Sequence, residues 1–250
     1  MTYCFPSVNA LSEKLSFDFV HFLDDASRGQ KIFTIALSGG KTPKAFFEKI
    51  AANPKSQDNQ TLWNKVHFFW VDERCVPPDH ADSNFCMTNE CLFSKISLDE
   101  SHVHRIHGEN DPYQEAARYA AEIHQYVELQ NGIPVFDWIF LGLGDDGHTA
   151  SIFPGRPDLL DTDTICEAVV HPVTGQFRIT LTGKPLLQAK RITFVVTGAS
   201  KSTVIREIMN NEAEALSYPA AQILWRSNNT DWFIDEAAAK YLNITCCGKY

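Results

Sequence analysis

The sequence lacks any apolar stretch long enough to cross a membrane. Across its 250 residues, no window approaches 18 consecutive apolar residues. The N-terminus, MTYCFPSVNALSEKLSFDF, has no basic region followed by an apolar run and no small-residue cleavage site. These absences predict a cytoplasmic protein without a membrane partner.

The sequence also lacks cysteine spacings typical of disulfide frameworks or zinc sites. The seven cysteines are odd in number and scattered, and no C-x-x-C pair occurs. This usage indicates neither a disulfide framework nor a zinc ribbon, so we expect reduced thiols. The C-terminal CCGKY is no prenylation signal, because Gly248 and Lys249 stand where aliphatic residues are needed.

Positive charge is scarce, since the formal net charge is −9 at pH 7. Nucleic acids and anionic membranes need a basic surface, so neither is expected as a partner. A phosphorylated ligand is also repelled at long range. Any phosphate site must therefore be built from local donors and a few well-placed cations.

The chain has no Ser/Gly/Pro-rich linker, no internal repeat and no low-complexity segment. Its size allows one large α/β domain or two small ones, and the missing linker favours one domain over residues 1–250.

Seven apolar or β-branched runs predict strands, and several are apolar on both faces, as in a parallel sheet covered on each side. They are Lys31–Leu37, Val66–Val71, Val135–Leu141, Glu167–His171, Phe177–Leu181, Arg191–Thr197 and Asp231–Ile234. Helical segments lie between them, most clearly Asp111–Leu129, with Asp111 as N-cap and Pro112 in the first position. Alternating strands and helices predict an α/β fold.

Glycine, charge and histidine gather where four of these strands end. The segments that follow them are SGGKTP, DERCVPPD, GLGDDGHTASIFPG and GASK. Ligands of parallel sheets bind beyond the carboxyl ends of the strands. We therefore expect the functional site at this edge.

The first segment, within LSGGKTPKAFF, resembles a P-loop at its end only. A P-loop would need a glycine at Ile35, which lies inside the predicted strand. Gly39 and Gly40 permit a sharp turn, Thr42 suits a helix cap and Pro43 the first helical position. Taken alone, the segment is equally a phosphate cradle or a tight bend.

The third segment spells G-x-G-x-x-G with Gly142, Gly144 and Gly147, the dinucleotide fingerprint. Two acidic residues inside it, and Pro154-Gly155 soon after, disfavour a nicotinamide enzyme. His148, two residues after Asp146, suits general acid–base chemistry. A lone D-G-H, however, favours a histidine that only caps the next helix, with Asp146 supporting the turn.

The remaining charged residues are ambiguous individually. Asp72, Glu73 and Arg74 form either a site cluster or a solvated ion-pair group, and Arg178 and Lys201 taken singly are ordinary surface charges. The run HVHRIH, with His102, His104 and His107, does not have the spacing of a helical metal-ligand pair, so no metal is expected.

Together, these segments resemble the 6-phosphogluconolactonase family. The matching pieces span roughly residues 35–224 and are LSGGKTP, FFWVDERCVPPDHADSN, LGLGDDGHTASIFPG, RITLT, VVTGASK and YPAAQIL. The resemblance implies a Rossmann-like three-layer sandwich with a mostly parallel sheet, related to glucosamine-6-phosphate deaminase and ribose-5-phosphate isomerase. Lys41 departs from the small polar residue that is common in the glycine loop.

The resemblance also implies hydrolysis of 6-phosphoglucono-δ-lactone in the oxidative pentose phosphate pathway, without metal or organic cofactor. His148 would be the general base, Asp146 its partner, and Arg74 the oxyanion ligand, with Asp72 and Glu73 nearby. The phosphate would be bound by Ser38, Gly39, Gly40, Lys41, Thr42, Arg178 and Lys201.

Two rivals stay open: a deaminase, although Phe153 replaces its glutamate, and a non-catalytic sugar-phosphate binder. The protein is expected to be a monomer or homodimer.

Overall fold

The computed structural model describes residues 1–27, 29, 31–57 and 60–246. Within them, a parallel sheet of six strands has the order β1-β11-β10-β7-β2-β3. Its strands are β1 (Thr2–Phe5), β2 (Phe33–Leu37), β3 (Val66–Trp70), β7 (Trp138–Leu141), β10 (Ile192–Val196) and β11 (Thr230–Asp235). Every residue of β3, β7 and β10 is buried, as predicted for strands covered on both faces.

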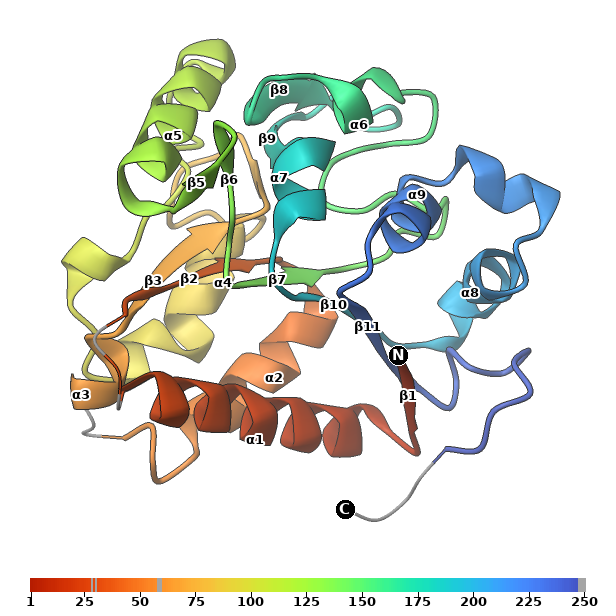
Figure 1. The fold of residues 1–250 in the computed structure, drawn as a ribbon, viewed down its shortest axis with the longest axis horizontal. Helices are drawn as coiled ribbons and strands as arrows, with labels where there is room; N and C mark the ends of the chain where they lie inside the picture. Colours follow the sequence, from red (N-terminus) through yellow and green to blue (C-terminus); the bar gives the residue numbers. More distant parts are fainter. Residues whose placement is uncertain (28, 30, 58–59, 247–250) are drawn as a thin grey trace.

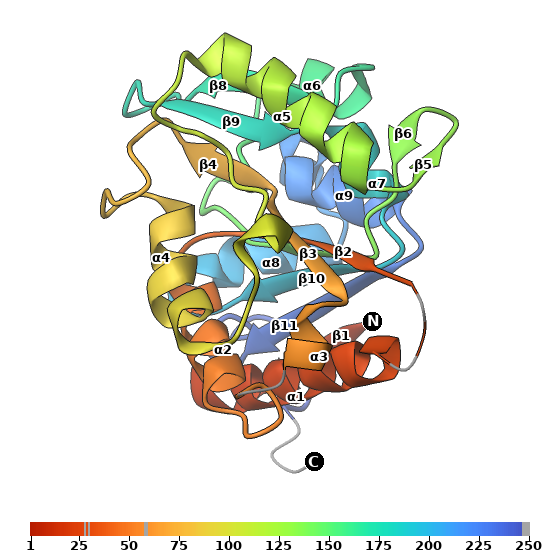
Figure 2. The same ribbon diagram turned by 90° about the vertical axis from the view of Figure 1, so that its left-hand side faces the viewer.

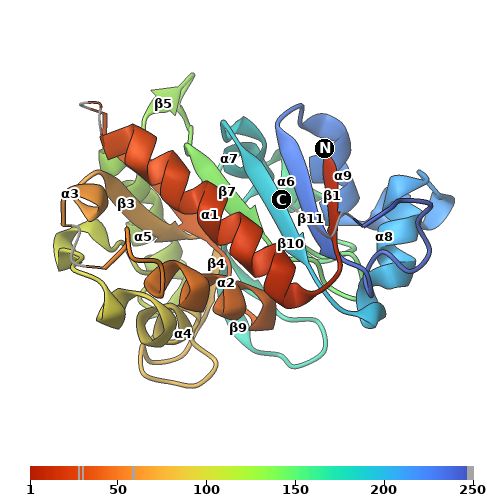
Figure 3. The same cartoon turned by 90° about the horizontal axis from the view of Figure 1, so that it is seen from below.

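Helices cover both faces of this sheet and make three layers (Figure 1). Seen from below, α1 runs diagonally across the strands beside α2 (Figure 3). The helices are α1 (Val8–Ser27), α2 (Lys41–Ala51), α3 (Gln60–Trp63), α4 (Asn84–Cys91), α5 (Pro112–Tyr126), α6 (Asp158–Asp161), α7 (Gly183–Gln188), α8 (Ser202–Met209) and α9 (Pro219–Arg226). The fold is thus the expected three-layer α/β sandwich with a mostly parallel sheet.

Helix α5 follows the prediction from its cap onward. The Asp111 side chain accepts hydrogen bonds from the backbone N–H groups of Tyr113 and Gln114, and Pro112 takes the first helical position. Ala116 and Ile123 are buried on the inner face. The helix ends at Tyr126, three residues before the predicted limit, and Val127 caps it.

A second sheet differs from expectation. The runs predicted near Glu167–His171 and Phe177–Leu181 are β8 (Cys166–Val170) and β9 (Phe177–Leu181), but they pair antiparallel, outside the parallel sheet. Their third partner is β4 (Asp72–Arg74), which the charged sequence DER did not suggest. Figure 2 shows this sheet above the parallel one, under α5. A two-stranded hairpin, β5 (Leu129–Gln130) with β6 (Ile133–Pro134), completes the strands described.

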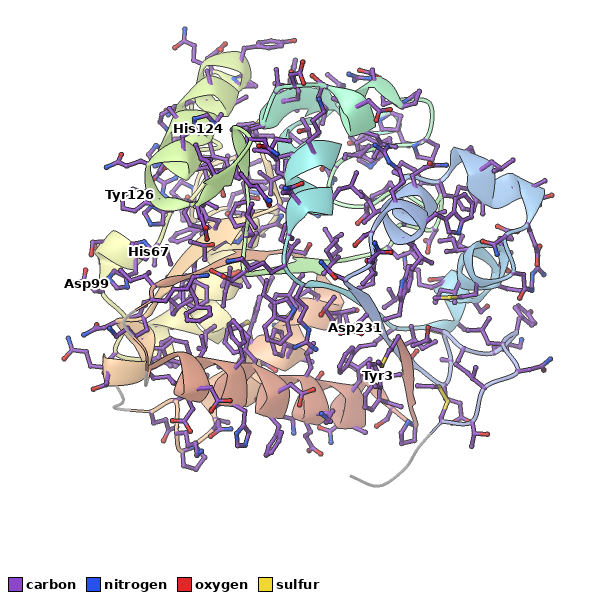
Figure 4. All side chains as sticks on the ribbon, in the orientation of Figure 1. Tyr3, His67, Asp99, His124, Tyr126 and Asp231 are labelled. Atoms are coloured by element: carbon purple, nitrogen blue, oxygen red, sulfur yellow. A yellow bond between two sulfur atoms is a disulfide. The ribbon has the colours of Figure 1, made fainter. Side chains whose placement is uncertain are left out.

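The expectation of reduced thiols is wrong for two cysteines. Cys4 in β1 and Cys246 near the C-terminus form a disulfide, drawn as the yellow bond in Figure 4. They are 242 residues apart, so no local spacing betrays the pair. Cys75, Cys86, Cys91 and Cys166 are free, and Cys247 lies outside the described residues.

A histidine cluster is buried at the amino end of β3, away from the carboxyl ends of the strands. The rings of His67 and His104 stack, and Nδ1 of His67 lies 2.6 Å from Nε2 of His104. His104 also bonds Glu122, and Tyr126 flanks His67 at 5.2 Å between ring centroids (Figure 4). Burial, together with His104 and His102 nearby, lowers the pKa of His67 to about 4.

This lowered pKa predicts acid-sensitive stability. The unfolded chain binds a proton at His67 near the ordinary histidine value of about 6.5, whereas the folded chain does so only near pH 4. The contribution of neutral His67 to the free energy of unfolding is therefore fully present above the pKa of the unfolded chain. It is lost as the pH falls from about 6.5 toward 4. Between pH 7 and 5, His67 accounts for a loss on the order of 2 kcal/mol.

Urea unfolding of the parent, His67→Gln and His124→Gln at pH 7 and pH 5 tests this prediction. His67→Gln should lose less stability on acidification than the parent does. His124, an exposed histidine on the same helix as Tyr126, is the control and should behave like the parent. Equal losses in all three proteins would contradict the prediction.

Candidate active site

The carboxyl ends of the central strands surround one cavity. In the sheet order, β2 is followed by β3 on one side, whereas β7, β10 and β11 extend on the other, so the strand order reverses between β2 and β7. Such a reversal opens a crevice between the two diverging loops. The cavity there has a volume of about 510 Å³. Its lining includes Ser38, Gly39, Gly40, Thr42, Asp72, Arg74, Asn84, Asp145, His148, Arg178, Thr197, Ser200 and Lys201.

The glycine turn after β2 enters α2 differently from the expectation. Gly40 is the N-cap, with φ at 107°, and α2 begins at Lys41, so Thr42 and Pro43 are its second and third residues. A Cβ on Gly39 would lie 1.7 Å from Oδ1 of Asn84, so only glycine fits there. Lys41 starts the helix, but its side chain lies outside the described part.

The two hydroxyls predicted in this turn already have partners within the protein. Ser38 is buried and donates to the carbonyl of Phe140 at 2.9 Å. The Oγ1 atoms of Thr42 and Thr197 are 2.7 Å apart, which ties the turn to the end of β10. Gly39, Gly40, Thr42 and Pro43 line the cavity wall.

His148 and Asp146 form a hydrogen-bonded pair. Nδ1 of His148 lies 2.6 Å from Oδ1 of Asp146, which also accepts from the His148 backbone N–H at 3.1 Å. Partial burial acts to raise the pKa of Asp146, but the hydrogen bonds from His148 outweigh it and lower this pKa to about 2. An ionised Asp146 keeps the proton of a neutral imidazole on Nδ1, so Nε2 carries a free lone pair.

The loop that carries this pair is tightly built. A Cβ on Gly144 would lie 2.1 Å from Nδ1 of His148. Gly147 has φ at 81°, and the Tyr218 ring packs against its Cα, so a Cβ there would lie 2.3 Å from that ring. Ala150 has the left-handed φ of 50°, unusual for a residue with a side chain. Three successive constraints thus fix the backbone around His148.

Strand β4 sends its three residues to different places. Asp72 reaches the cavity and accepts from the Ser151 hydroxyl at 2.6 Å. Glu73 does not line the cavity: its carboxylate is buried and accepts from the backbone N–H groups of Arg74, Asn84 and Phe85 and from the Ser83 hydroxyl. Burial raises the pKa of Glu73, and these bonds partly offset the shift. Glu73 therefore anchors the start of α4.

Arg74 and Arg178 stand directly opposite each other in the antiparallel pair of β4 and β9. Like charges in such a position repel, and both Nε atoms are buried without a hydrogen-bond partner. Asp72 approaches Arg178 at 3.9 Å, and Arg74 donates from Nη1 to the carbonyl of Asp82 at 2.7 Å. Both residues line the cavity, and their positive charge favours an anionic or carbonyl ligand there.

Lys201 comes from the segment after β10 and pairs with Asp145 at 2.7 Å. Its side chain is largely covered, whereas that of Asp145 is 68% exposed. Lys201 lies on the cavity wall with Ser200 and Thr197.

Sequence reasoning missed Asn84 and Ser151. Asn84 donates to the backbone carbonyl of Asp72 at 2.8 Å and fills the space that Gly39 leaves open. Ser151 connects Asp72 with Arg178, whose Nη1 lies 3.5 Å from the Ser151 hydroxyl. Both residues occur in the quoted motifs, but their roles depend on contacts between distant segments.

A dinucleotide-binding site requires a helix directly after its glycine motif, and this helix is absent between Gly147 and α6. After Gly142, Gly144 and Gly147 the chain forms turns, and no helix begins before α6 at Asp158. Among the described residues, no group of three or more His, Cys, Asp or Glu side chains is arranged to hold a metal ion. No helix in the described part is long and apolar enough to span a membrane.

The fold and cavity define a Rossmann-like α/β protein with a site at the strand-order reversal. The chain belongs to the family of glucosamine-6-phosphate isomerases and 6-phosphogluconolactonase, whose model matches residues 6–232.

Named relatives agree with this family. A 6-phosphogluconolactonase of Haemophilus influenzae is 40% identical over 238 residues, covering 95% of this chain and 98% of that protein. The structure of a 6-phosphogluconolactonase from Trypanosoma brucei superposes with a TM-score of 0.84 at 27% identity, covering 97% and 98% of the two chains. A monomeric glucosamine-6-phosphate deaminase shares the fold, with a TM-score of 0.77 at 19% identity over 96% and 98% of the chains.

Gly144→Ala should displace the His148 ring, because the new methyl group would overlap Nδ1. Gly142→Ala is the matched control, since a Cβ there meets nothing within 4 Å. We expect Gly144→Ala alone to lose the low-field NMR signal of an Nδ1 proton held by a carboxylate, and to unfold at a lower temperature. An intact signal in Gly144→Ala, or its loss in both variants, would contradict this geometry.

Proposed function

We propose that this protein hydrolyses 6-phosphoglucono-δ-lactone to 6-phosphogluconate, as a 6-phosphogluconolactonase of the pentose phosphate pathway. The observation that carries the proposal is that His148, paired with Asp146 at 2.6 Å, lines a cavity that Arg74, Arg178 and Lys201 also line. A general base beside cationic groups suits water attack on a phosphorylated ester. The named relatives support the same activity.

The proposed reaction begins with a water molecule hydrogen-bonded to Nε2 of His148. The imidazole takes a proton as the water oxygen attacks the lactone carbonyl, and Asp146 stabilises the resulting imidazolium. Arg74, which lines the cavity, stabilises the oxyanion with its guanidinium. When the ring C–O bond breaks, the imidazolium returns its proton to the leaving oxygen. No metal or organic cofactor enters these steps.

The phosphate is proposed to lie against the turn after β2 and Lys201. Gly39, Gly40 and Thr42 present backbone donors at the start of α2, and Lys201 supplies the charge across the cavity. Arg178 adds positive charge from β9. Glu73 acts as a positioning residue in this scheme, because its carboxylate is occupied by the start of α4.

Aldose–ketose chemistry on glucosamine 6-phosphate is the second candidate, since the family includes such enzymes. The glutamate expected five residues after the histidine is here Phe153. Its ring is buried and lies 4.9 Å from the rings of both His148 and His171. An apolar ring in that place cannot transfer a proton, so we expect no deamination.

Two assays test the function. With freshly generated 6-phosphoglucono-δ-lactone, hydrolysis should clearly exceed the spontaneous rate, and with glucosamine 6-phosphate no ammonia should appear. Spontaneous hydrolysis alone would favour a non-catalytic sugar-phosphate binder. Ammonia release at an enzymatic rate would favour the deaminase.

His148→Asn should abolish most of the turnover without unfolding the protein. Loss of a positioned base lowers kcat by about 10²- to 10⁴-fold. Thermal unfolding on the same preparation is the control. A stable, fully active His148→Asn would reduce His148 to a structural cap.

Lys201→Ala and Arg178→Ala should weaken substrate binding. A charge-assisted contact to phosphate is worth about 1.5–3 kcal/mol, which corresponds to roughly a tenfold to over a hundredfold loss in kcat/KM, mostly through KM. Inorganic phosphate should compete with the substrate in the parent. Lys184→Ala, which removes a lysine paired with Asp163 outside the cavity, is the matched control. Unchanged kinetics in both site variants would place the phosphate elsewhere.

A further inference from the structure

Two of the cavity's cations, Arg178 and Lys201, form ion pairs with carboxylates of the protein. Arg178 faces Asp72 at 3.9 Å, and Lys201 faces Asp145 at 2.7 Å. An arriving phosphate therefore meets cations whose charge is partly neutralised. The phosphate can displace a carboxylate from its cation only where the protein holds that carboxylate weakly.

The two carboxylates differ in this respect. Asp72 is buried and accepts from Ser151 and Asn84, so the protein holds it in place. The Asp145 side chain is 68% exposed, and it pairs with Lys201, the phosphate ligand proposed above, and hydrogen-bonds Ser200 beside it. Asp145 can turn toward solvent at little cost, whereas Asp72 cannot. Asp145 is therefore the movable member.

We propose that Asp145 is a displaceable counter-ion of the phosphate subsite: it pairs with Lys201 and yields Lys201 to an incoming phosphate. Asp145 then sets the affinity of the subsite by competing with the ligand. This inference rests on the phosphate part of the proposed function.

The charge balance of the reaction gives such a residue a use. Hydrolysis of a lactone creates a carboxylate, so the product carries more negative charge than the substrate. A cavity lined by Arg74, Arg178 and Lys201 holds such a product more strongly than its substrate. A carboxylate that returns to Lys201 opposes this retention and favours release. Hydrogen bonding from Lys201 lowers the pKa of Asp145, so the competing group stays ionised near neutral pH.

The test measures equilibrium binding of inorganic phosphate by calorimetry, which needs no turnover. D145N should bind phosphate about threefold to tenfold more tightly than the parent, because a partly exposed ion pair no longer competes. D163N is the matched control: it removes the same charge from another lysine pair, that of Lys184, which does not line the cavity. Its affinity should stay within about twofold of the parent.

A second comparison uses K201A as background. If Asp145 acts through Lys201, D145N should no longer tighten binding when Lys201 is absent. Weaker or unchanged phosphate binding in D145N would overturn the proposal, since Asp145 would then either position Lys201 or have no effect on binding. Equal tightening in D145N and D163N would overturn it as a general charge effect.

Absence of phosphate binding to the parent would also overturn it. The lactone assay stands apart from all these results. A parent without lactonase activity in which D145N still tightens phosphate binding would refute the proposed function and leave this inference intact.

Discussion

The repulsion between Arg74 and Arg178 is the constraint around which the site is organised. Strand pairing holds them directly opposite each other, where like charges are unfavourable. The surroundings offset this repulsion with Asp72, which Ser151 and Asn84 hold in place. Because the formal net charge of the chain is −9, such local placement is the means by which it presents positive charge to an anion.

Two sheets have to meet for this cavity to exist. The parallel sheet supplies the glycine turn, the His148 loop and the Lys201 segment at its carboxyl edge (Figure 1). The antiparallel sheet supplies both arginines, and the chain passes from one sheet to the other at Val71. There the Val71 N–H donates to Leu37 of the parallel sheet, and its carbonyl accepts from Leu181 of the other. The parallel strand ends alone would give the glycine turn, the His148 loop and Lys201 without the arginine pair.

Much of this arrangement can be predicted from the sequence, because it depends on local patterns. Runs apolar on both faces identify the central strands, and parallel direction brings their carboxyl ends to one edge. Helix α5 is recognisable from Asp111 and Pro112 alone. His148 can be identified for the same reason, because it lies in the segment after a strand and two residues after the carboxylate of Asp146.

The rest depends on contacts between distant segments. Strand β4 reads as a charged loop because its partner, β9, lies about a hundred residues further along the chain. The fit of Gly39 to Asn84, the anchoring of α4 by Glu73 and the Cys4–Cys246 disulfide all join residues that no spacing rule connects. The residues of the site motifs can thus be identified from the sequence. Which of them line the cavity, and which partners they contact, can be seen only in the folded structure.

The most direct measurement is a crystal structure with 6-phosphogluconate bound. We expect its phosphate within hydrogen-bond distance of Lys201 and the backbone of residues 39–42, and its carboxylate near Nε2 of His148 and the Arg74 guanidinium. A product bound in the opposite direction, with its phosphate near Nε2 of His148 and its carboxylate near Lys201, would contradict the assignment of base, oxyanion ligand and phosphate clamp. Binding outside this cavity would contradict it altogether.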